Sequence, residues 1–144
     1  MTLAFRNVDV DPRAPVSTWP YEALVTAIER GTLGDWARIT KAIDDAPWGD
    51  VARQVEEYLA YSRPYGVAPL LQRAVVRARS QAETRERAAV AAEVRALPAA
   101  SGLSAAQFAR AIGTSRSRLS TYRSGSVTPS AALLVRMRGV ATGA

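Results

Sequence analysis

Residues 116–124 bring arginine and hydroxyl side chains together at a helical spacing. Arg116, Ser117, Ser120 and Thr121 recur at intervals of three and four residues, so in a helix they share one face. The fork of an arginine can donate two hydrogen bonds to a guanine, and serine or threonine hydroxyls can bond to any base. No acidic residue interrupts this face, as a polyanionic partner requires. The chemistry open to the segment is therefore recognition of base edges in the major groove of a duplex.

Two short helices joined by a tight turn are predicted to hold this face in place. Ser104 is followed three residues later by Gln107, the spacing of a capping box, in which each side chain satisfies a backbone N–H of the other residue. The first helix is therefore expected to begin near Ala105. Gly113 permits the left-handed backbone that ends a helix, and a turn of about three residues leads into the second helix.

The second helix is expected to pack on the first through a small apolar core. Thr114 or Ser115 can cap its start, since either hydroxyl can accept a hydrogen bond from a first-turn N–H. Ala109 falls where two steeply crossing helices touch backbone to backbone, so Ala109→Leu is expected to unfold the unit. The predicted core consists of Phe108, Ala109, Ile112, Leu119 and Tyr122.

The two predicted helices and the residues after them match a known family pattern. The matching positions are Leu103, Ser104, Ala109, Ile112, Gly113, Leu119, Tyr122, Gly125, Thr128, Pro129 and Ser130. Over about residues 86–139 the chain thereby resembles the helix-turn-helix of the Cro/CI (XRE-like) family of phage and bacterial regulators. The resemblance implies an all-α, lambda-repressor-like domain that binds double-stranded DNA. It also implies base contacts from the outer face of the second helix, here Arg116, Ser117, Ser120 and Thr121.

The resemblance further implies contacts to the DNA backbone. Backbone N–H groups at a helix start attract anions, and the helix entered by residues 128–130 resembles a phosphate anchor of the family. Arg110 and Arg136 are expected to add to phosphate attraction. The family often has Gln at the position of Ala105, where this chain departs from it. The residues assigned to backbone contacts are Ser104, Gln107, Ser115, Arg118, Arg123, Ser124, Thr128 and Ser130.

The positive charge of the chain is concentrated in its second half. The 144 residues carry a formal charge of +6. Residues 1–64 hold 7 basic and 10 acidic residues, whereas residues 65–144 hold 12 basic and 3 acidic ones. From residue 101 onward there are six arginines and no acidic residue. A solvated basic face is the alternative explanation, but beside a helix-turn-helix pattern the imbalance favours phosphate binding and double-stranded DNA as the partner.

The chain contains no cysteine and no histidine. A zinc site of the usual ligands, a disulfide, a thiol nucleophile and a histidine base are therefore excluded, and no metal or cofactor is expected. The acidic pairs Asp44-Asp45 and Glu56-Glu57 are typical of a solvated surface, so an enzyme is not expected. No apolar run is long enough to span a bilayer and no signal peptide opens the chain, so we expect no membrane contact and a cytoplasmic location. Arginine makes up eighteen of the nineteen basic residues, which suggests a G- and C-rich bacterial or phage genome.

The chain is expected to consist of an arm, a helical bundle and a helix-turn-helix domain. Residues 1–18 contain few periodic apolar side chains, so we expect an extended or mobile arm in preference to a minor-groove arm with Arg6 and Arg13. The bundle is expected over residues 19–82 and the helix-turn-helix domain over residues 83–144. The boundary is placed inside a helical connector because no glycine- or serine-rich stretch lies there.

Apolar stripes and helix breakers divide the bundle into helices. The first is expected to be capped by Thr18 and to end at Gly31, and the second is expected over residues 33–46. Residues 67–97 are expected to form one long helix or two, which Pro98 ends or kinks. The apolar stripe of the third helix is Val51, Val55, Tyr58 and Leu59.

Two functions remain open from the sequence. The first is a sequence-specific transcriptional regulator, most simply a repressor, that forms a homodimer through its N-terminal bundle and reads an inverted repeat with half-sites about 34 Å apart. The second is an antitoxin-like protein whose N-terminal bundle binds a protein partner while its C-terminal domain regulates its own operon. Residues 19–24 and 61–66 are similar to segments of small actinobacterial helix-turn-helix proteins.

Overall fold

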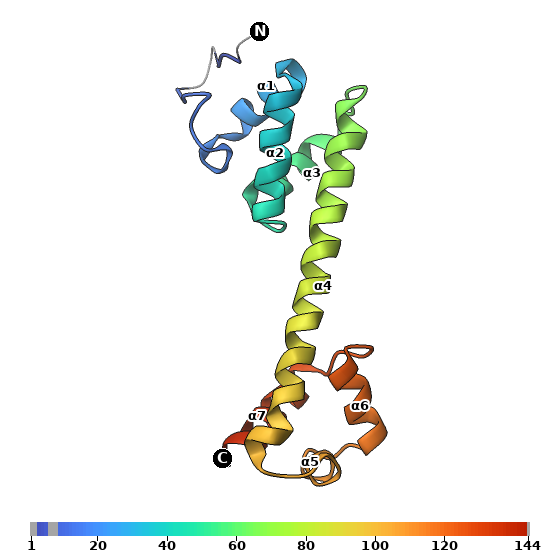
Figure 1. Ribbon diagram of the computed structural model, residues 1–144. Coiled ribbons are helices and arrows are strands. Elements are labelled where there is room, and N and C mark those ends of the chain that lie inside the picture. The colour runs from blue at the N-terminus through green and yellow to red at the C-terminus, as the bar shows by residue number, and fades with distance from the viewer. Residues whose placement is uncertain (1–2, 6–8, 144) are drawn as a thin grey trace. The chain divides into compact units, whose positions relative to one another are not determined.

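The computed structural model of the protein describes residues 3–5 and 9–143. These residues form a short 3-10 helix and seven α-helices and contain no strand, which confirms the all-α prediction. No helix among them is both long and apolar enough to cross a membrane. The elements of Figure 1 are η1 (Val16–Thr18), α1 (Tyr21–Arg30), α2 (Leu33–Asp45), α3 (Asp50–Leu59), α4 (Val67–Ser101), α5 (Ala105–Ala111), α6 (Arg116–Ser124) and α7 (Ala131–Thr142).

The chain divides into two compact units, residues 1–82 (unit 1) and residues 83–144 (unit 2). The division falls inside α4, so this helix contributes to both units. Each unit has an apolar core of its own. Unit 1 contains ten basic and ten acidic residues, whereas unit 2 contains nine basic and three acidic ones. The whole net charge of +6 is therefore carried by unit 2.

Unit 1 is built from α1, α2, α3 and the first half of α4 around one core. Thr32 caps α2 in a capping box with Asp35, because each side chain accepts a hydrogen bond from the backbone N–H of the other residue. The residue at the start of α1 is Pro20 and not Thr18, whose hydroxyl donates to an upstream backbone carbonyl instead. The largest fully buried side chains here are Leu24, Ile28, Ile39, Ile43, Val55, Tyr58, Val67 and Leu71.

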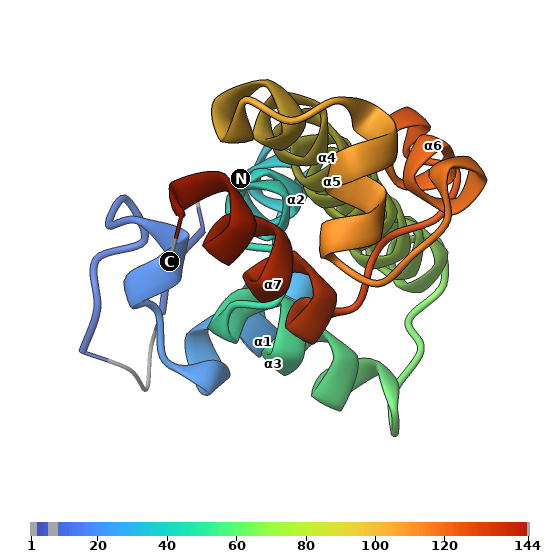
Figure 2. The same ribbon diagram turned by 90° about the horizontal axis from the view of Figure 1, so that it is seen from below.

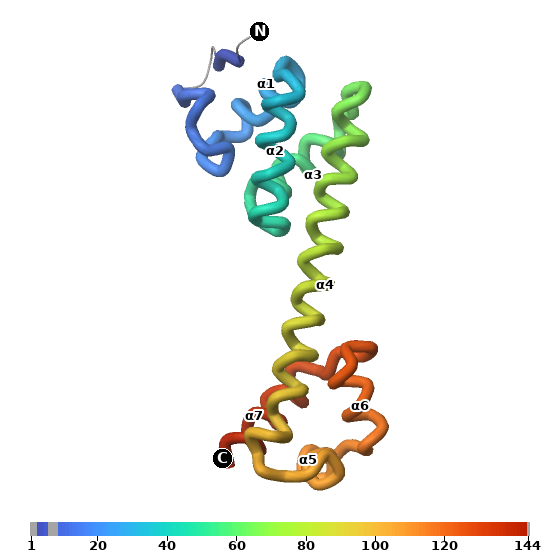
Figure 3. The backbone as a smooth tube through the Cα atoms, viewed as in Figure 1, coloured from blue at the N-terminus to red at the C-terminus, as the bar shows by residue number. Residues whose placement is uncertain are grey.

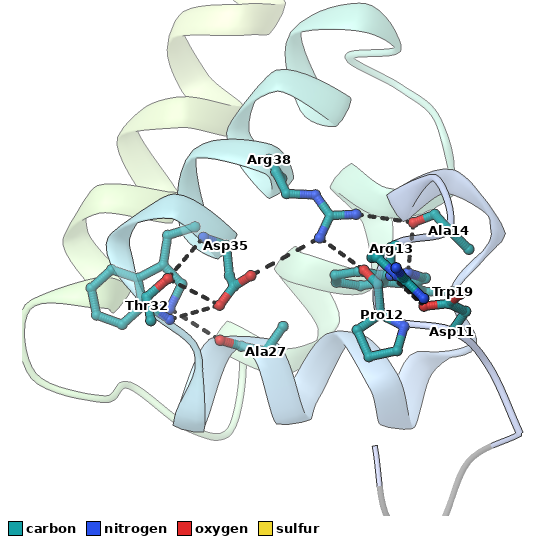
Figure 4. Close-up of polar contacts among 10 residues, drawn as sticks. Asp11, Pro12, Arg13, Ala14, Trp19, Ala27, Thr32, Asp35 and Arg38 are labelled. Atoms are coloured by element: carbon teal, nitrogen blue, oxygen red, sulfur yellow. Dashed lines mark hydrogen bonds and ion pairs between the residues drawn. The ribbon is translucent and has the colours of Figure 1, made fainter. Parts of the chain in front are cut away.

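Within unit 1, a side chain of α2 binds residues 9–18. Arg38 donates from Nη1 to the carbonyl of Pro12 (2.8 Å) and from Nη2 to the carbonyl of Ala14 (3.0 Å), as Figure 4 shows. The indole N–H of Trp19 donates to the same Ala14 carbonyl at 3.1 Å, and the Arg38 guanidinium lies 5.0 Å from the centre of the Trp19 ring. An arginine more than twenty residues away thus binds two carbonyls of this stretch, a contact that the expectation of an extended or mobile arm over residues 1–18 did not include.

Two basic residues of this N-terminal stretch, Arg6 and Arg13, were considered for a minor-groove arm. Arg13 pairs with Asp11, with 3.5 Å between Nε and Oδ1, and is exposed. Arg6, the other residue considered for a minor-groove arm, lies outside the described residues. The half-buried side chains that add to the core of unit 1 from this end of the chain are Leu3, Phe5 and Val10.

The helix α4 is one continuous helix of 35 residues (Figure 3). Pro98, which was expected to end or kink the helix, lies inside it and does not end it. Proline has no backbone N–H, which removes one hydrogen bond from the helix without stopping it. The helix ends where Gly102 adopts a φ of +74°, and the N–H of Leu103 then donates to the Ser101 hydroxyl at 3.1 Å.

In unit 2, α5, α6 and α7 pack around the second half of α4. In both Figure 1 and Figure 2, α6 lies at an edge of this unit, with α4 and α5 on one side of it only. Four of the five core residues expected from the sequence are buried, and Tyr122 packs against them half-buried. Val94 of α4 and Met137 of α7 complete the core. Its buried members are Val94, Phe108, Ala109, Ile112, Leu119 and Met137.

Candidate nucleic-acid interface

The start of α5 has the capping box that the sequence predicts. The N–H of Gln107 donates to the Ser104 hydroxyl at 3.1 Å, and the N–H of Ser104 donates to Oε1 of Gln107 at 2.9 Å. Phe108 and Ala109 follow on the buried side of the helix. Both capping side chains are exposed. The Ser104 O–H and the Gln107 amide NH₂ are not used by the capping box, so both can donate a hydrogen bond to a ligand.

Four residues, 112–115, connect α5 to α6. Gly113 adopts a φ of +78°, the left-handed conformation expected of it. The N–H of Thr114 donates back to the carbonyl of Ala109 at 2.9 Å. Of the two candidate caps, Ser115 is the one used, since its hydroxyl accepts from the N–H of Arg118 at 3.1 Å. The turn therefore fixes the direction in which α6 leaves α5.

The packing of α6 determines which of its side chains face outward. Leu119 is 1% exposed and lies in the core of unit 2. Because residues three and four apart share a helix face, the opposite positions point away from the core. Arg116, Ser117 and Ser120 are exposed and Thr121 is half-buried. The four proposed base-contact residues thus lie on one helix, whose opposite face is packed into the core of unit 2 through Leu119.

The hydroxyl groups of α6 differ in the hydrogen bonds that they still have available. Thr121 donates from Oγ1 to the carbonyl of Arg118 at 2.6 Å, and Ser124 donates to the carbonyl of Thr121 at 3.1 Å. In this arrangement both oxygens can only accept. The Ser117 hydroxyl lies 3.2 Å from that of another serine at the start of the helix. Ser120 has no hydrogen bond from its hydroxyl to any described residue, so it can both donate and accept.

Arginines of unit 2 divide into those with and without partners. Nη1 of Arg136 donates to the carbonyl of Ile112 at 2.9 Å, which ties α7 to the end of α5. Arg138 donates from Nε and from Nη2 to the two carboxylate oxygens of Glu93, at 2.6 and 3.1 Å. Arg136 thus uses one nitrogen of the guanidinium that was expected to contact phosphate in a hydrogen bond within the protein. Within the described part of the chain, the guanidinium groups without a hydrogen bond or ion pair include those of Arg110, Arg116, Arg118 and Arg123.

Three helices of unit 2 begin at serine caps. Ser130 caps α7 by accepting from the N–H of Leu133 at 3.1 Å, as Ser104 and Ser115 do for α5 and α6. Thr128 and Ser130 are both exposed. No acidic residue lies in the first turn of any of these helices. Their N-terminal N–H groups therefore keep the partial positive charge that favours an anion.

Two contacts that hold the interface were not predicted from the sequence. Nη1 of Arg95, on α4, donates to the carbonyl of Arg123 at 2.8 Å and so anchors the C-terminal end of α6. The hydrogen bonds from Arg138 lower the pKa of the Glu93 carboxyl below its usual range. The partners are 28 and 45 residues apart in the chain, so no local spacing indicates either contact.

Comparison with known proteins agrees with this geometry. Residues 82–138 match the family model described as a helix-turn-helix domain. The matched range contains the second half of α4, the whole of α5 and α6 and most of α7. No curated protein and no solved structure matched the chain. The C-terminal part of the protein is therefore a helix-turn-helix domain, a type of domain that is typical of DNA-binding regulators.

Proposed function

We propose that the protein is a sequence-specific transcriptional regulator, acting as a repressor, that inserts α6 into the major groove of double-stranded DNA. The observation that carries the proposal is the outer face of α6. It presents the Arg116 guanidinium and the Ser120 hydroxyl, which have no hydrogen bond to any described residue, in a helix-turn-helix domain that holds all of the net charge of +6. The XRE-like pattern of the sequence supports the same reading of the domain.

The hydrogen bonds of α6 suggest a role for each base-contact residue. Arg116 occupies the first turn, where its guanidinium can reach the O6 and N7 atoms of a guanine. Ser120 is assigned a base edge that offers either a donor or an acceptor. Thr121 is assigned a base donor, such as the amino group of adenine or cytosine, because its own proton is used within the helix. Ser117 lies beside Arg116 and contributes a further hydroxyl.

Phosphate contacts are assigned to the remaining cationic and capping groups. Arg110, Arg118 and Arg123 lie on α5 and α6, and their guanidinium groups make no hydrogen bond or ion pair within the part of the chain that the structure describes. The capped N-termini of α5, α6 and α7 can each donate backbone N–H groups to a phosphate. These contacts position the domain without reading sequence.

A homodimer formed through unit 1 completes the proposal for repression. Two recognition helices about 34 Å apart would match an inverted repeat with half-sites one helical turn apart. A dimer on such a site would occlude it from other proteins. A second candidate function, an autoregulator whose N-terminal unit binds a protein partner, is favoured by a groove between α2 and the first half of α4 that is lined by apolar side chains and two arginines.

Selection of bound duplexes from a random pool tests the proposed function directly. The full chain should enrich one sequence and bind it at least about a thousandfold more tightly than a scrambled duplex at the same salt concentration. An inverted repeat in the selected site would support the dimer, whereas a single unrepeated half-site would reject it. Enrichment of no sequence, or equal affinity for selected and scrambled duplexes, would reject sequence-specific recognition altogether.

A further inference from the structure

A groove of about 430 Å³ runs between α2 and the first half of α4 in unit 1. Its lining contains apolar side chains, small residues and two arginines, and it contains no acidic residue. All of the lining residues belong to unit 1, and none belongs to the helix-turn-helix domain. The residues that matter for the argument are Leu33, Trp36, Ala37, Leu70, Arg73 and Arg77.

Large apolar side chains line both walls of the groove. Leu33, at the first position of α2, is 74% exposed, and Leu70, on α4, is 40% exposed. Trp36 already donates its indole N–H to the carbonyl of Ala27 at 3.1 Å, so its ring offers the groove an apolar surface without a free donor. Leucines exposed on two facing helices leave apolar area in water that a bound partner would bury.

The cations of the groove are not neutralised within the protein. Arg73 and Arg77 are exposed and lie four residues apart, which places them one turn apart on the same face of α4. Neither has a hydrogen bond or ion pair to any described residue. Several other arginines of unit 1 do have such partners. Arg79 donates to a carboxylate oxygen of Glu56 at 2.6 Å, for example. The groove therefore presents two positive charges without a partner in the described part of the chain, beside the apolar side chains Leu33 and Leu70.

We propose that this groove binds an acidic amphipathic helix of another protein. An apolar ridge with residues at i, i+3, i+4 and i+7 would pack between Leu33 and Leu70. Carboxylates four residues apart on the flank of that helix would pair with Arg73 and Arg77. The two arginines are complementary in charge to the carboxylates of such a helix, and the leucines are complementary to its apolar ridge. This complementarity selects the occupant. The proposal does not rest on DNA recognition, because the groove lies wholly in unit 1.

The adjoining surface of α4 sets the length of the partner helix. Val76 is 64% exposed and lies on the face of α4 that carries both arginines. A hollow of about 660 Å³ runs along this face from Pro69 to Gln81. At 1.5 Å per residue this stretch is roughly 18 Å long, which corresponds to a partner helix of about three to four turns.

A second copy of this chain is a poorer occupant than another protein. The helix α3 has the acidic residues such a ligand needs, but its apolar side chains Val51, Val55 and Tyr58 are buried in the core of unit 1. The apolar side of α1 is buried in the same core. Either helix would have to leave its own core before it could enter the groove of another copy. Nucleic acid would match the two arginines but not the exposed leucines.

The test measures binding of fluorescent peptides to the full chain. Three acidic amphipathic peptides of about 16 residues, roughly four helical turns, differ in whether Leu, Phe or Trp forms the ridge. A version of each with lysine in place of glutamate controls for charge. Leu33→Ser removes an exposed apolar wall, and Arg73→Glu with Arg77→Glu reverses the cationic one. The matched control variants are Val135→Ser, at a 63% exposed valine of unit 2, and Arg30→Glu, at an exposed arginine of α1.

At least one acidic peptide should bind, and its lysine version should not. Leu33→Ser and the double arginine reversal should each weaken binding by at least about tenfold, whereas the control variants should stay within about twofold. Binding should also weaken as salt rises from about 50 to about 300 mM. DNA binding, measured on the same variants, should be unchanged, which separates this proposal from the proposed function.

Failure of all three acidic peptides to bind would overturn the proposal, as would equal binding of the lysine versions. Binding that neither groove variant weakens would place the peptide elsewhere and overturn it too. The oligomeric state of the wild type and of Leu33→Ser is measured by sedimentation. A wild-type dimer that Leu33→Ser converts to a monomer would identify a second copy as the occupant and reject a foreign helix.

Discussion

Substitution of Leu119 by alanine tests whether an independent core supports α6. Leu119 is 1% exposed and packs in unit 2 with Phe108, Ile112 and Met137. Loss of three carbon atoms removes about 2.4 kcal/mol of transfer free energy at about 0.8 kcal/mol each. The cavity left behind adds about 1 kcal/mol. We therefore expect Leu119→Ala to lower the free energy of unfolding of unit 2 by about 3.5 kcal/mol, against a total of about 3 to 9 kcal/mol for a unit of this length.

The placement of the tryptophans allows the two units to be followed separately. Trp19, Trp36 and Trp48, all the tryptophans of the chain, lie in unit 1. Tryptophan fluorescence during urea unfolding therefore reports on unit 1, whereas far-ultraviolet circular dichroism reports on the helices of both units. With a urea dependence of about 1 kcal/mol per molar, Leu119→Ala should lower the midpoint of unit 2 by roughly 3 M. The fluorescence midpoint should stay within about 0.5 M of the wild type.

The matched control is Val135→Ala, at an exposed position of α7 in the same unit. This variant should change neither transition by more than about 0.5 kcal/mol. Leu119→Ala should also abolish DNA binding at urea concentrations where unit 1 is still folded. A fluorescence midpoint that falls as far as the dichroism midpoint would refute the reasoning, because it would mean that α4 couples the two cores into one cooperative unit.

Three further predictions concern local contacts. Ser104→Ala should remove the capping box of α5 and lower the free energy of unfolding of unit 2 by about 1 kcal/mol, measured by the dichroism midpoint; an unchanged midpoint would argue against the cap. Arg38→Ala should release the backbone held by its two hydrogen bonds, making residues 9–18 susceptible to proteolysis and shifting the emission of Trp19; equal protease resistance would count against this role. The Glu93 carboxyl has a pKa below its usual value when the protein is folded, so its pairing with Arg138 stabilises the fold above the unfolded pKa and is lost as pH falls through the lowered one. The stability difference between the wild type and Glu93→Gln should therefore be present at pH 7, shrink as pH falls below the ordinary glutamate pKa of about 4.3, and vanish once the pH lies below the lowered pKa; a difference that does not shrink with falling pH would contradict the pairing.

Local hydrogen bonds and helical spacing made most of the helix-turn-helix predictable. The capping box of Ser104 and Gln107 depends on residues three positions apart, so the sequence contains all of its chemistry. Gly113 was predictable because few other residues adopt its positive φ. The buried side of α6 followed from the spacing of Leu119 and Tyr122. In each case the partners are neighbours in the chain.

Contacts between distant residues were not predictable in the same way. Arg136 and Arg95 bind backbone carbonyls that lie 24 and 28 residues away, and any exposed arginine of the sequence could have made such contacts. The hydrogen bonds of Arg38 to the carbonyls of Pro12 and Ala14 could not be predicted for the same reason, since these partners lie 26 and 24 residues away. Pro98 was expected to end or kink α4, and the helix continues through it to a glycine with positive φ. Pro98 is buried in unit 2, so tertiary packing outweighed the local preference of proline.

Base preference at single positions of the selected duplex tests the central claim most directly. The affinity of the wild type and of Arg116→Ala is measured for the selected site and for all of its single-base variants, with Arg110→Ala as the control on α5. The account predicts that Arg116→Ala loses about 1 to 3 kcal/mol of discrimination at one base pair while other positions keep theirs. Arg110→Ala should weaken all duplexes alike and reduce the salt dependence by about one counterion. An equal loss on every duplex for Arg116→Ala would contradict the claim that α6 reads the major groove through this residue.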